Sequence, residues 1–486
     1  MRGRERPADG YPLEIAPRVL GLLAAAIVAG SVTSVATGER TSAGAEAPAP
    51  AERITVTDEL RQPIDGWGAA VVADDPMEPL VEPRMPPTRV KELDRLVFRE
   101  AGINLIRVFS PGYGNERASG RVGAPVMDDP RFALMRRGAP YGVKFMLTGA
   151  DAPAWMLTVP AQAALRHART PGRAVLGKPL ARGHEKAYAR YLGRILVFAK
   201  DRIGRQFDYA AVANEPDNHA ALLTMTPQQA AAAYAELARI IRSEHLRTRL
   251  VIGDDTTWRA TIRYARAELV APGVRQEAAV IGSHAYGGSR ADRLALAALA
   301  DKNHLSVWET EWTNGCRGCS RTAEAVMARA LGWSEQIEEA IDDAAARAWF
   351  TLLPAAVKHG ASGTLVVRRL RDPLKPFFLT KRFYLLRQYT YAGPAGSRSL
   401  AVTVDPPSPS VYAVAFKNGD RVSVVVTNAN PTQQRVLLDL GSARSSLERY
   451  RTSADENFRS LPPLSYGGRP LLVTLPKESV TTFTRS

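Results

Sequence analysis

The stretch SVWETEW, residues 306–312, decides how the rest of the chain is organised. Its apolar start and its two closing carboxylates predict a buried strand with an acidic C-terminal end. The stretch DYAAVANEP, residues 208–216, repeats the pattern with one glutamate at its end. Two carboxylates on separate strand ends are suited to acid/base or nucleophilic work on an acetal bond. We therefore take Glu215 and Glu311 as the centre of a candidate site.

Length and composition indicate a large folded chain with a positive surface. The 486 residues, 45% of them hydrophobic, are enough for several domains or for one barrel with a smaller module. The net charge of +15 points first to nucleic acid. The arginines are scattered, however, and no basic stripe with interleaved aromatic residues is present in the sequence. We expect no nucleic-acid partner, and favour association with an anionic cell envelope or an acidic glycan.

The N-terminus predicts an export segment over residues 1–36. Four early arginines precede an apolar run at residues 19–36, and Ser34-Val35-Ala36 fits a small-residue cleavage site. An uncleaved N-terminal anchor is the alternative, because about 18 apolar residues just span a bilayer. Residues 37–51, rich in Ala, Gly, Pro and Ser, predict a flexible linker. The pattern favours a protein that is secreted or associated with the cell envelope.

Between residues 65 and 393, short apolar strands alternate with helix-like segments. Eight strands are predicted, at residues 67–72, 103–109, 143–148, 209–213, 250–253, 279–284, 305–310 and 363–367. Helices are predicted at residues 89–100, after Thr226-Pro227, and at residues 334–349. Eight strand–helix units predict a (β/α)8 TIM barrel, an α/β fold whose active site lies at the C-terminal ends of the strands.

Residues 394–486 predict an appended antiparallel β-sandwich. Residues 411–416 and 421–426 are alternating apolar runs around Asn418-Gly419, which is a strong hairpin signal. Further strands are predicted at residues 435–440, 471–475 and 480–484. An early strand within residues 52–64 precedes the barrel. We expect it to join the β-sandwich, so that both chain ends meet in one sheet.

Polar and aromatic residues gather at the predicted C-terminal strand ends. The polar ones are Arg107, Asp151, Asn214, Glu215, Asp254, Asp255, His284, Tyr286, Glu309 and Glu311. Five of the seven tryptophans fall there as well, namely Trp67, Trp155, Trp258, Trp308 and Trp312. Because aromatic faces stack on the apolar faces of sugar rings, the set predicts a carbohydrate cleft. For each tryptophan the alternative is packing of a helix onto the barrel.

The two cysteines, Cys316 and Cys319, are three positions apart and follow the Glu311 strand. A structural zinc site usually needs four ligands, and no partner ligands are paired nearby in the sequence. In an exported protein the pair predicts a small loop-closing disulfide. The sequence gives no phosphate-binding glycine loop and no convincing metal cluster, so we expect neither a metal nor a cofactor.

The order and spacing of several motifs resemble glycoside hydrolase family 30 of clan A, the glucosylceramidase and endoxylanase relatives. The motifs are GWG at residues 66–68, GINLIRV at 102–108, APAWM at 152–156, NEP at 214–216, HAY at 284–286, WETE at 308–311 and LPKESVTTF at 475–483. The resemblance covers most of residues 52–486. It implies a barrel with a β-sandwich fed by both termini, and a retaining mechanism.

The resemblance also implies roles for individual residues. Glu215 matches the general acid/base, and Glu311 matches the nucleophile. Asn214 would hydrogen-bond the sugar 2-hydroxyl beside the scissile bond. Arg107 would hold Glu311 ionised, because a nearby cation lowers the pKa of a carboxylate. Tyr286 would position Glu311.

Other family positions concern the sugar pocket. His284 would line it, and the cluster of strand-end tryptophans predicts Trp155, Trp258 and Trp312 as its walls. Two residues depart from the family pattern: Asp151 stands where a tryptophan is common, and Ala285 stands where an aromatic residue is usual. Both departures touch the sugar pocket, so they bear on the choice of sugar, and they motivate the alternative of a non-catalytic binding protein. Asp151 either binds a hydroxyl or amino group of the sugar or caps a loop.

The sequence therefore predicts an exported, monomeric, retaining glycosidase that acts on the β-linked carbohydrate of an oligosaccharide, polysaccharide or glycoconjugate. Glu309 is a rival nucleophile, because residues two apart on a strand face the same side. One alternative is a non-catalytic carbohydrate-binding protein on the same scaffold. Another is a transglycosylase, in which a sugar hydroxyl replaces water.

Overall fold

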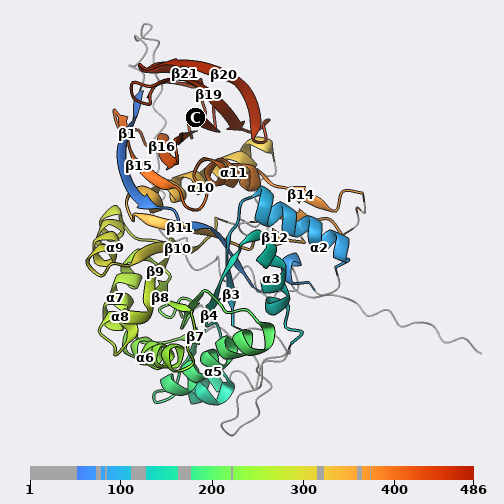
Figure 1. The fold of residues 1–486 in the computed structure, drawn as a ribbon, viewed down its shortest axis with the longest axis vertical. Helices are drawn as coiled ribbons and strands as arrows, with labels where there is room; N and C mark the ends of the chain where they lie inside the picture. Colours follow the sequence, from blue (N-terminus) through green and yellow to red (C-terminus); the bar gives the residue numbers. More distant parts are fainter. Residues whose placement is uncertain are drawn as a thin grey trace, which may run out of the picture.

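The computed structural model describes residues 52–72, 78–82, 85–110, 127–162, 177–219, 223–314, 322–357, 364–370, 372 and 374–485. A closed barrel of parallel strands forms one part of the molecule, and a large mixed sheet forms a further domain (Figure 1). The predicted fold class is thereby confirmed. The predicted export segment and linker, and the predicted disulfide between Cys316 and Cys319, lie outside the described residues.

Eight neighbouring strands close the barrel. They are β2 (Gly66–Val71), β3 (Leu105–Phe109), β4 (Lys144–Thr148), β6 (Tyr209–Ala211), β8 (Arg249–Asp255), β9 (Ala278–His284), β10 (Ser306–Trp312) and β11 (Ala346–Leu352). Apolar side chains fill the interior, among them Met146, Val251, Trp308 and Phe350. Strands that are buried on both faces read as continuous apolar runs, which is why most of them can be found in the sequence.

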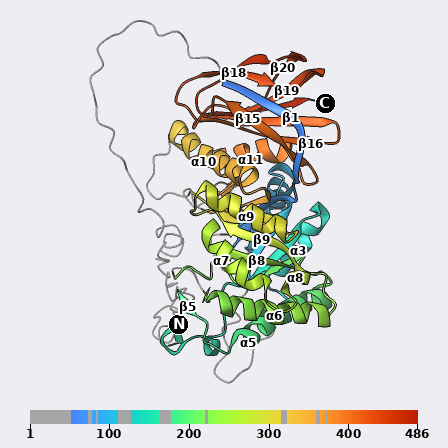
Figure 2. The ribbon, with the colours of Figure 1, turned by 90° about the vertical axis from the view of Figure 1, so that its left-hand side faces the viewer.

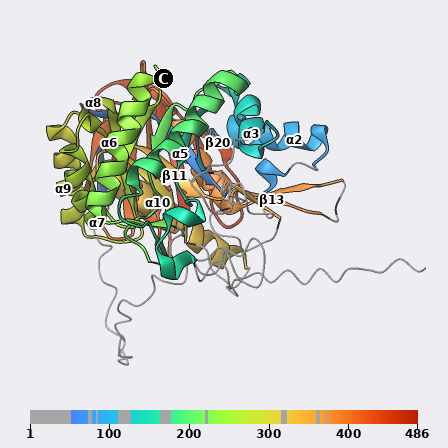
Figure 3. The same cartoon turned by 90° about the horizontal axis from the view of Figure 1, so that it is seen from below.

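Helices cover the outside of the barrel (Figure 3). They include α2 (Pro87–Asp94), α3 (Pro130–Gly138), α5 (Glu185–Phe198), α6 (Pro227–Ser243), α7 (Trp258–Leu269) and α9 (Arg290–Lys302). The start of α6 shows how the sequence sets a helix end. The Thr226 side chain accepts a hydrogen bond from the Gln229 backbone, and the Gln229 side chain accepts one from the Thr226 backbone. This capping box and Pro227 at the first helical position fix the start.

The eighth barrel strand is not the predicted one. Helix α10 (Ala323–Asp342) ends before β11, which closes the barrel. The predicted helix at residues 334–349 is therefore right only as far as Asp342, and the predicted barrel strand at residues 363–367 is wrong. Ala345 ends the helical run because its φ of 51° is left-handed. No glycine or proline marks this break in the sequence. Val366–Arg368 is instead β13, in a small sheet with β12 (Ala355–Ala356) and β14 (Phe377–Leu379).

The second domain is a nine-stranded sheet. Its spatial order is β20 (Arg459–Gly467), β19 (Arg444–Thr452), β22 (Ser479–Arg485), β17 (Arg421–Asn428), β16 (Val411–Asn418), β15 (Arg398–Asp405), β1 (Glu52–Pro63), β18 (Gln434–Asp439) and β21 (Leu471–Leu475). Strand β1 pairs antiparallel with β15 and parallel with β18. The first described strand of the chain therefore lies inside the sheet formed by the last hundred residues, as expected.

Alternation along the strands divides this sheet between two cores. Ala413 and Val424 belong to a core made by the sheet itself. Their neighbours Val414 and Val425 belong to the main core that includes the barrel helices. Helices α10 and α11 (Lys381–Ala392) lie between barrel and sheet (Figures 1 and 2). Because side chains alternate between the faces of a strand, one sheet serves both cores.

The length and composition of a helix decide whether it can cross a membrane. Across the ranges given above, no helix combines the length and the apolar composition needed to cross a bilayer.

Candidate functional site

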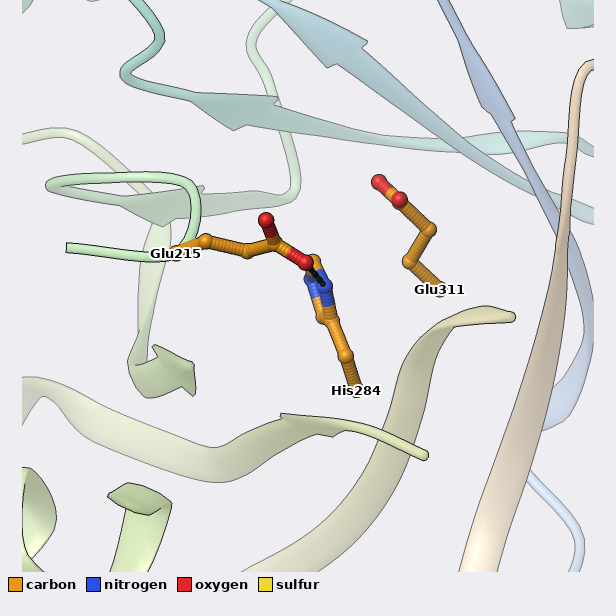
Figure 4. A group of neighbouring side chains, drawn as sticks. All are labelled: Glu215, His284 and Glu311. Atoms are coloured by element: carbon orange, nitrogen blue, oxygen red, sulfur yellow. Dashed lines mark hydrogen bonds and ion pairs between the residues drawn. The ribbon is translucent and has the colours of Figure 1, made fainter. Parts of the chain in front are cut away.

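Three side chains meet at the C-terminal end of the barrel, each from a different strand end. Glu215 follows β6, His284 ends β9, and Glu311 lies near the end of β10 (Figure 4). One nitrogen or oxygen atom of each lies within 4.8 Å of those of the other two. All three side chains are buried. The motifs NEP, HAY and WETE, far apart in the sequence, are thus brought together.

Irregular backbone sets the positions of the two glutamates. Glu215 has a left-handed φ of 47°, and its backbone N–H donates to the Asp254 carbonyl at 2.9 Å. Glu309 pairs with Ser283 and Glu311 with His284, so β10 has one extra residue between these pairs. A bulge of this kind bends a strand and re-aims its side chains. Strained and bulged backbone is common at functional sites.

Arg107, at 0% exposure, is the hub of the site. It donates to Glu311 Oε2 at 3.0 Å and to Asp254 Oδ2 at 2.7 Å. It also donates to Asn214 Oδ1 at 2.6 Å. Because all three partners are protein groups, Arg107 acts by positioning its neighbours and by lowering the pKa of the carboxyl groups among them.

Glu311 has two donors, one on each oxygen. Arg107 donates to Oε2, and the Tyr286 hydroxyl donates to Oε1 at 3.1 Å. Burial raises the pKa of Glu311 above its ordinary value, while the positive charges of His284 and Arg107 lower it and the charge of Glu215 raises it. Arg107 therefore acts in the predicted direction on the pKa, although burial outweighs it.

His284 bridges two carboxylates. Its Nδ1 lies 2.8 Å from Glu215 Oε1, and its Nε2 lies 3.6 Å from Asp254 Oδ1. Burial lowers the pKa of His284, but Glu311, Asp254 and Glu215 together raise it well above the ordinary value. His284 is 0% exposed and both ring nitrogens face protein groups. His284 therefore contacts the acid/base candidate Glu215 directly, and its predicted place in the sugar pocket stays a prediction.

Asp254 is the main residue of the site that has no role in the sequence-based predictions. Its Oδ1 accepts a hydrogen bond from the Thr310 hydroxyl at 2.6 Å, and its Oδ2 accepts one from Arg107. Burial acts to raise the pKa of Asp254, but Arg107 and His284 hold it well below the ordinary value. The only sequence signal was an acidic residue at a strand end. Its φ of 70° places it at a bulge in β8.

A second residue that the sequence analysis missed is Asn218, which donates to Glu215 Oε2 at 2.8 Å. Its position just after the NEP motif is the one signal that pointed to it.

The rival carboxylate, Glu309, has a different environment. Its Oε2 accepts a hydrogen bond from the Phe350 backbone at 3.2 Å, and Oε1 has no partner among the described residues. Burial raises the pKa of Glu309 well above its ordinary value. Glu309 therefore ties β10 to β11, whereas Glu311 is held by Arg107 and Tyr286, and this geometry favours Glu311 as the reactive carboxylate.

Asp151 and the three tryptophans predicted to line the sugar pocket divide into partly exposed and buried residues. Asp151 is one-third exposed and accepts a hydrogen bond from the buried Lys178 at 2.6 Å. Trp155 and Trp312 are half-buried. Trp258, by contrast, is 2% exposed. A buried ring offers no face to a sugar, so the assignment of Trp258 to the substrate wall is corrected to helix packing.

The same correction applies to two other strand-end tryptophans. Trp67 is 2% exposed and donates to the Gly393 carbonyl at 2.7 Å. Trp308 is 1% exposed and fills the barrel interior. Of the five tryptophans at strand ends, packing thus accounts for three.

The cluster of Glu215, His284 and Glu311 is also compact enough to hold a metal ion. The charges disfavour this. Arg107 lies 3.4 Å from His284 Nε2 and donates to Glu311, so a cation already occupies the electrostatic position that a metal would need. Both imidazole nitrogens also face carboxylates, which favours the protonated ring over a ligand.

Comparisons with known proteins concern the sequence and the fold. No family model matches the chain. The glucuronoxylanase XynC of Bacillus subtilis is 25% identical over 308 residues, which are 61% of this chain. The match spans 65% of XynC, less than two thirds of its length.

Solved structures share the fold. A family 30 endoxylanase from Clostridium papyrosolvens has a TM-score of 0.67 and 18% identity, covering 89% of this chain and 100% of its own. The endo-β-1,6-glucanase BT3312 has a TM-score of 0.64 and 17% identity, covering 89% and 94%. This chain therefore shares its fold with enzymes of glycoside hydrolase family 30 and is similar in sequence to a glucuronoxylanase.

Proposed function

We propose that this chain is an exported glycoside hydrolase that cleaves a β-glycosidic bond with retention of configuration. The observation that carries the proposal is the pair of buried carboxylates, Glu215 and Glu311, whose oxygens approach within 4.8 Å on separate strand ends. Retaining enzymes hold the two carboxyl groups about 5 Å apart, whereas inverting enzymes leave room for a water molecule at about 6.5–9.5 Å. The spacing supports a double displacement.

Glu311 is the proposed nucleophile. As the bond between its carboxylate oxygen and the anomeric carbon forms, the bond from that carbon to the leaving oxygen breaks, and the Glu215 proton moves to the leaving oxygen. Counting charges supports this division. Arg107 and protonated His284 are balanced by Asp254 and Glu311, so the cluster is neutral when Glu215 carries a proton.

In the second step Glu215 takes a proton from water, and the water oxygen replaces the ester bond to Glu311. The proposed role of Asn214 fits its contacts. Its Oδ1 is occupied by Arg107 at 2.6 Å, while its amide hydrogens have no partner in the described part of the chain. Those hydrogens are available to a sugar hydroxyl.

The substrate class follows from the relatives. XynC is named for glucuronoxylan, and the neighbouring structures include an endoxylanase and a β-1,6-glucanase. These names support a β-linked polysaccharide and a first test on xylans and glucans. The apolar segment at residues 19–36 supports export.

The test is turnover by the full chain on β-xylan, β-glucans, galactan, arabinogalactan and aryl β-glycosides, with three variants. Glu311→Gln and Glu215→Gln each should lower kcat by at least about 10³-fold on a polysaccharide. The matched control is Glu309→Gln, which keeps an oxygen that can accept from the Phe350 backbone and should retain activity within about tenfold. NMR of the first product should show the β anomer.

Other outcomes would change the assignment. An α first product would refute the retaining mechanism. Activity that survives Glu311→Gln but not Glu309→Gln would transfer the role to Glu309. Binding to the polysaccharides without turnover would indicate a carbohydrate-binding protein, and longer products in place of free sugars would indicate a transglycosylase.

A further inference from the structure

A hollow lies at the opposite end of the barrel from Glu215 and Glu311. Its volume is about 350 Å³, and it is lined by Lys144, Gln206, Phe207, Asp208, Tyr209, Arg247 and Arg249. Lys144, Tyr209 and Arg249 are the first residues of β4, β6 and β8, which are neighbours in the barrel. The hollow therefore opens on the N-terminal face of the strands, away from the end where active sites of this fold lie.

The lining is unbalanced in charge. Three cations face one acid, Asp208, and Asp208 Oδ2 accepts a hydrogen bond from the Phe145 backbone at 2.8 Å. The Arg249 guanidinium donates to backbone carbonyls at 3.0 to 3.1 Å, which hold it in place. The Lys144 ammonium and the Arg247 guanidinium have no hydrogen bond or ion pair with the part of the chain described above. Both charges are thus available to a ligand.

The neutral lining residues add donors and a ring. Gln206 accepts the Arg247 backbone N–H at 2.6 Å through Oε1, which leaves its amide hydrogens available. The Tyr209 ring lies edge-on to Trp308, with centroids 4.6 Å apart. Burial raises the pKa of Tyr209 to about 12, so its hydroxyl keeps its proton. The hollow therefore combines several donors, two unpaired cations and a fixed aromatic ring.

We propose that this hollow is an accessory binding site for an acidic sugar, whose carboxylate or other oxyanion lies between Lys144 and Arg247 beside the Tyr209 ring. Exposed cationic side chains around a hollow favour an anionic ligand, because charge-assisted hydrogen bonds are about twice as strong as neutral ones. The site goes beyond the proposed hydrolysis, since it lies at the other end of the barrel and takes no part in bond cleavage.

Equilibrium binding tests the site directly. Isothermal titration calorimetry measures binding of tetragalacturonate and, separately, of inorganic phosphate to the full chain. Two proteins are compared, each with a different pair of substitutions. All proteins carry Glu311→Gln, so that the ligand is not consumed and the result does not depend on turnover. Lys144→Gln/Arg247→Gln alters the hollow. Arg266→Gln/Lys302→Gln is the matched control, because both residues are exposed on outer helices and the loss of charge is the same.

We expect the hollow variant to bind tetragalacturonate about tenfold more weakly, and the control to stay within about twofold. Competition by millimolar phosphate would identify an isolated oxyanion as the recognised group, and binding of tetragalacturonate alone would identify the sugar acid. Equal losses in both double variants would overturn the proposal in favour of diffuse attraction to a positive surface. Absence of binding to either probe would also overturn it.

Discussion

Replacing Asp254 with Asn tests the ion network beneath Glu215 and Glu311. The two oxygens of Asp254 accept from different donors, Thr310 at 2.6 Å and Arg107 at 2.7 Å. Asn has a single oxygen, so one of these donors would face an amide N–H group. The substitution also removes a negative charge that Arg107 and His284 both face. We therefore expect Asp254→Asn to destabilise the barrel and to lower activity.

The magnitude follows from the burial and the remaining contacts. Removing one partner from a buried ion pair costs about 3–5 kcal/mol. Arg107 keeps Glu311 at 3.0 Å, so we expect the lower end, about 3 kcal/mol at pH 7. This corresponds to a fall in Tm of roughly 6 °C for a large chain. Because the pKa of Asp254 is held below its unfolded value, its contribution is present above about pH 4 and declines as the pH falls further.

The neighbouring residue supplies the control. Asp255 is equally buried, and neither of its oxygens has a hydrogen-bond partner within the described ranges. Burial raises its pKa well above the ordinary value, so Asp255→Asn removes a carboxyl group whose ionised form is disfavoured by folding. Thermal unfolding at pH 7 should therefore show a Tm that is unchanged or raised for this variant, and not lowered. At pH 3 the loss of Tm caused by Asp254→Asn should be smaller than at pH 7. Equal shifts for the two variants at pH 7 would refute the assignment of charge.

Three further predictions concern single side chains. Glu268→Gln should stabilise the protein at pH 7 by on the order of 3 kcal/mol. Burial raises the pKa of Glu268 to about 8, so the wild-type protein loses stability as the pH rises from about 4.5 to about 8. Urea unfolding midpoints of the two proteins that changed in parallel from pH 5 to pH 7.5 would contradict this. Tyr286→Phe removes the 3.1 Å donor on Glu311 and should lower kcat/KM by roughly 10- to 100-fold, with little change in Tm. Trp155→Ala should raise KM on a polysaccharide. Trp258→Ala, at a buried position, should cost about 3–5 kcal/mol of stability and leave KM of the folded enzyme unchanged. The opposite pattern in kinetics and unfolding would place Trp258, and not Trp155, in the substrate wall.

Much of the architecture could be predicted from the sequence, because buried parallel strands leave apolar runs and the fold places their ends together. Strand-end residues as distant as Arg107 and Glu311 were grouped correctly on that rule alone. The hairpin at Asn418-Gly419 was equally legible, since its turn needs a left-handed residue and Gly419 has a φ of 60°. In these cases local signals and the fold agree.

The errors occurred where no local signal exists. Ala345 has a left-handed φ without being glycine, so the end of α10 and the start of β11 were not visible. A tryptophan near a strand end has the same sequence pattern whether its ring faces solvent, as Trp155 partly does, or packs inside, as Trp258 does. The role of Asp254 depends on a bulge and on three partners from other strands, which only the closed barrel brings together.

The position of β1 has a consequence for the order of folding. This strand is the first to be synthesised in the described chain, yet its partners β15 and β18 come more than three hundred residues later. Contacts with so large a separation in sequence form slowly, because loop closure must precede them. During synthesis β1 must remain unpaired until the last strands have left the ribosome. A fragment that begins after Pro63 would lack the strand that joins β15 to β18, and its sheet would be divided in two.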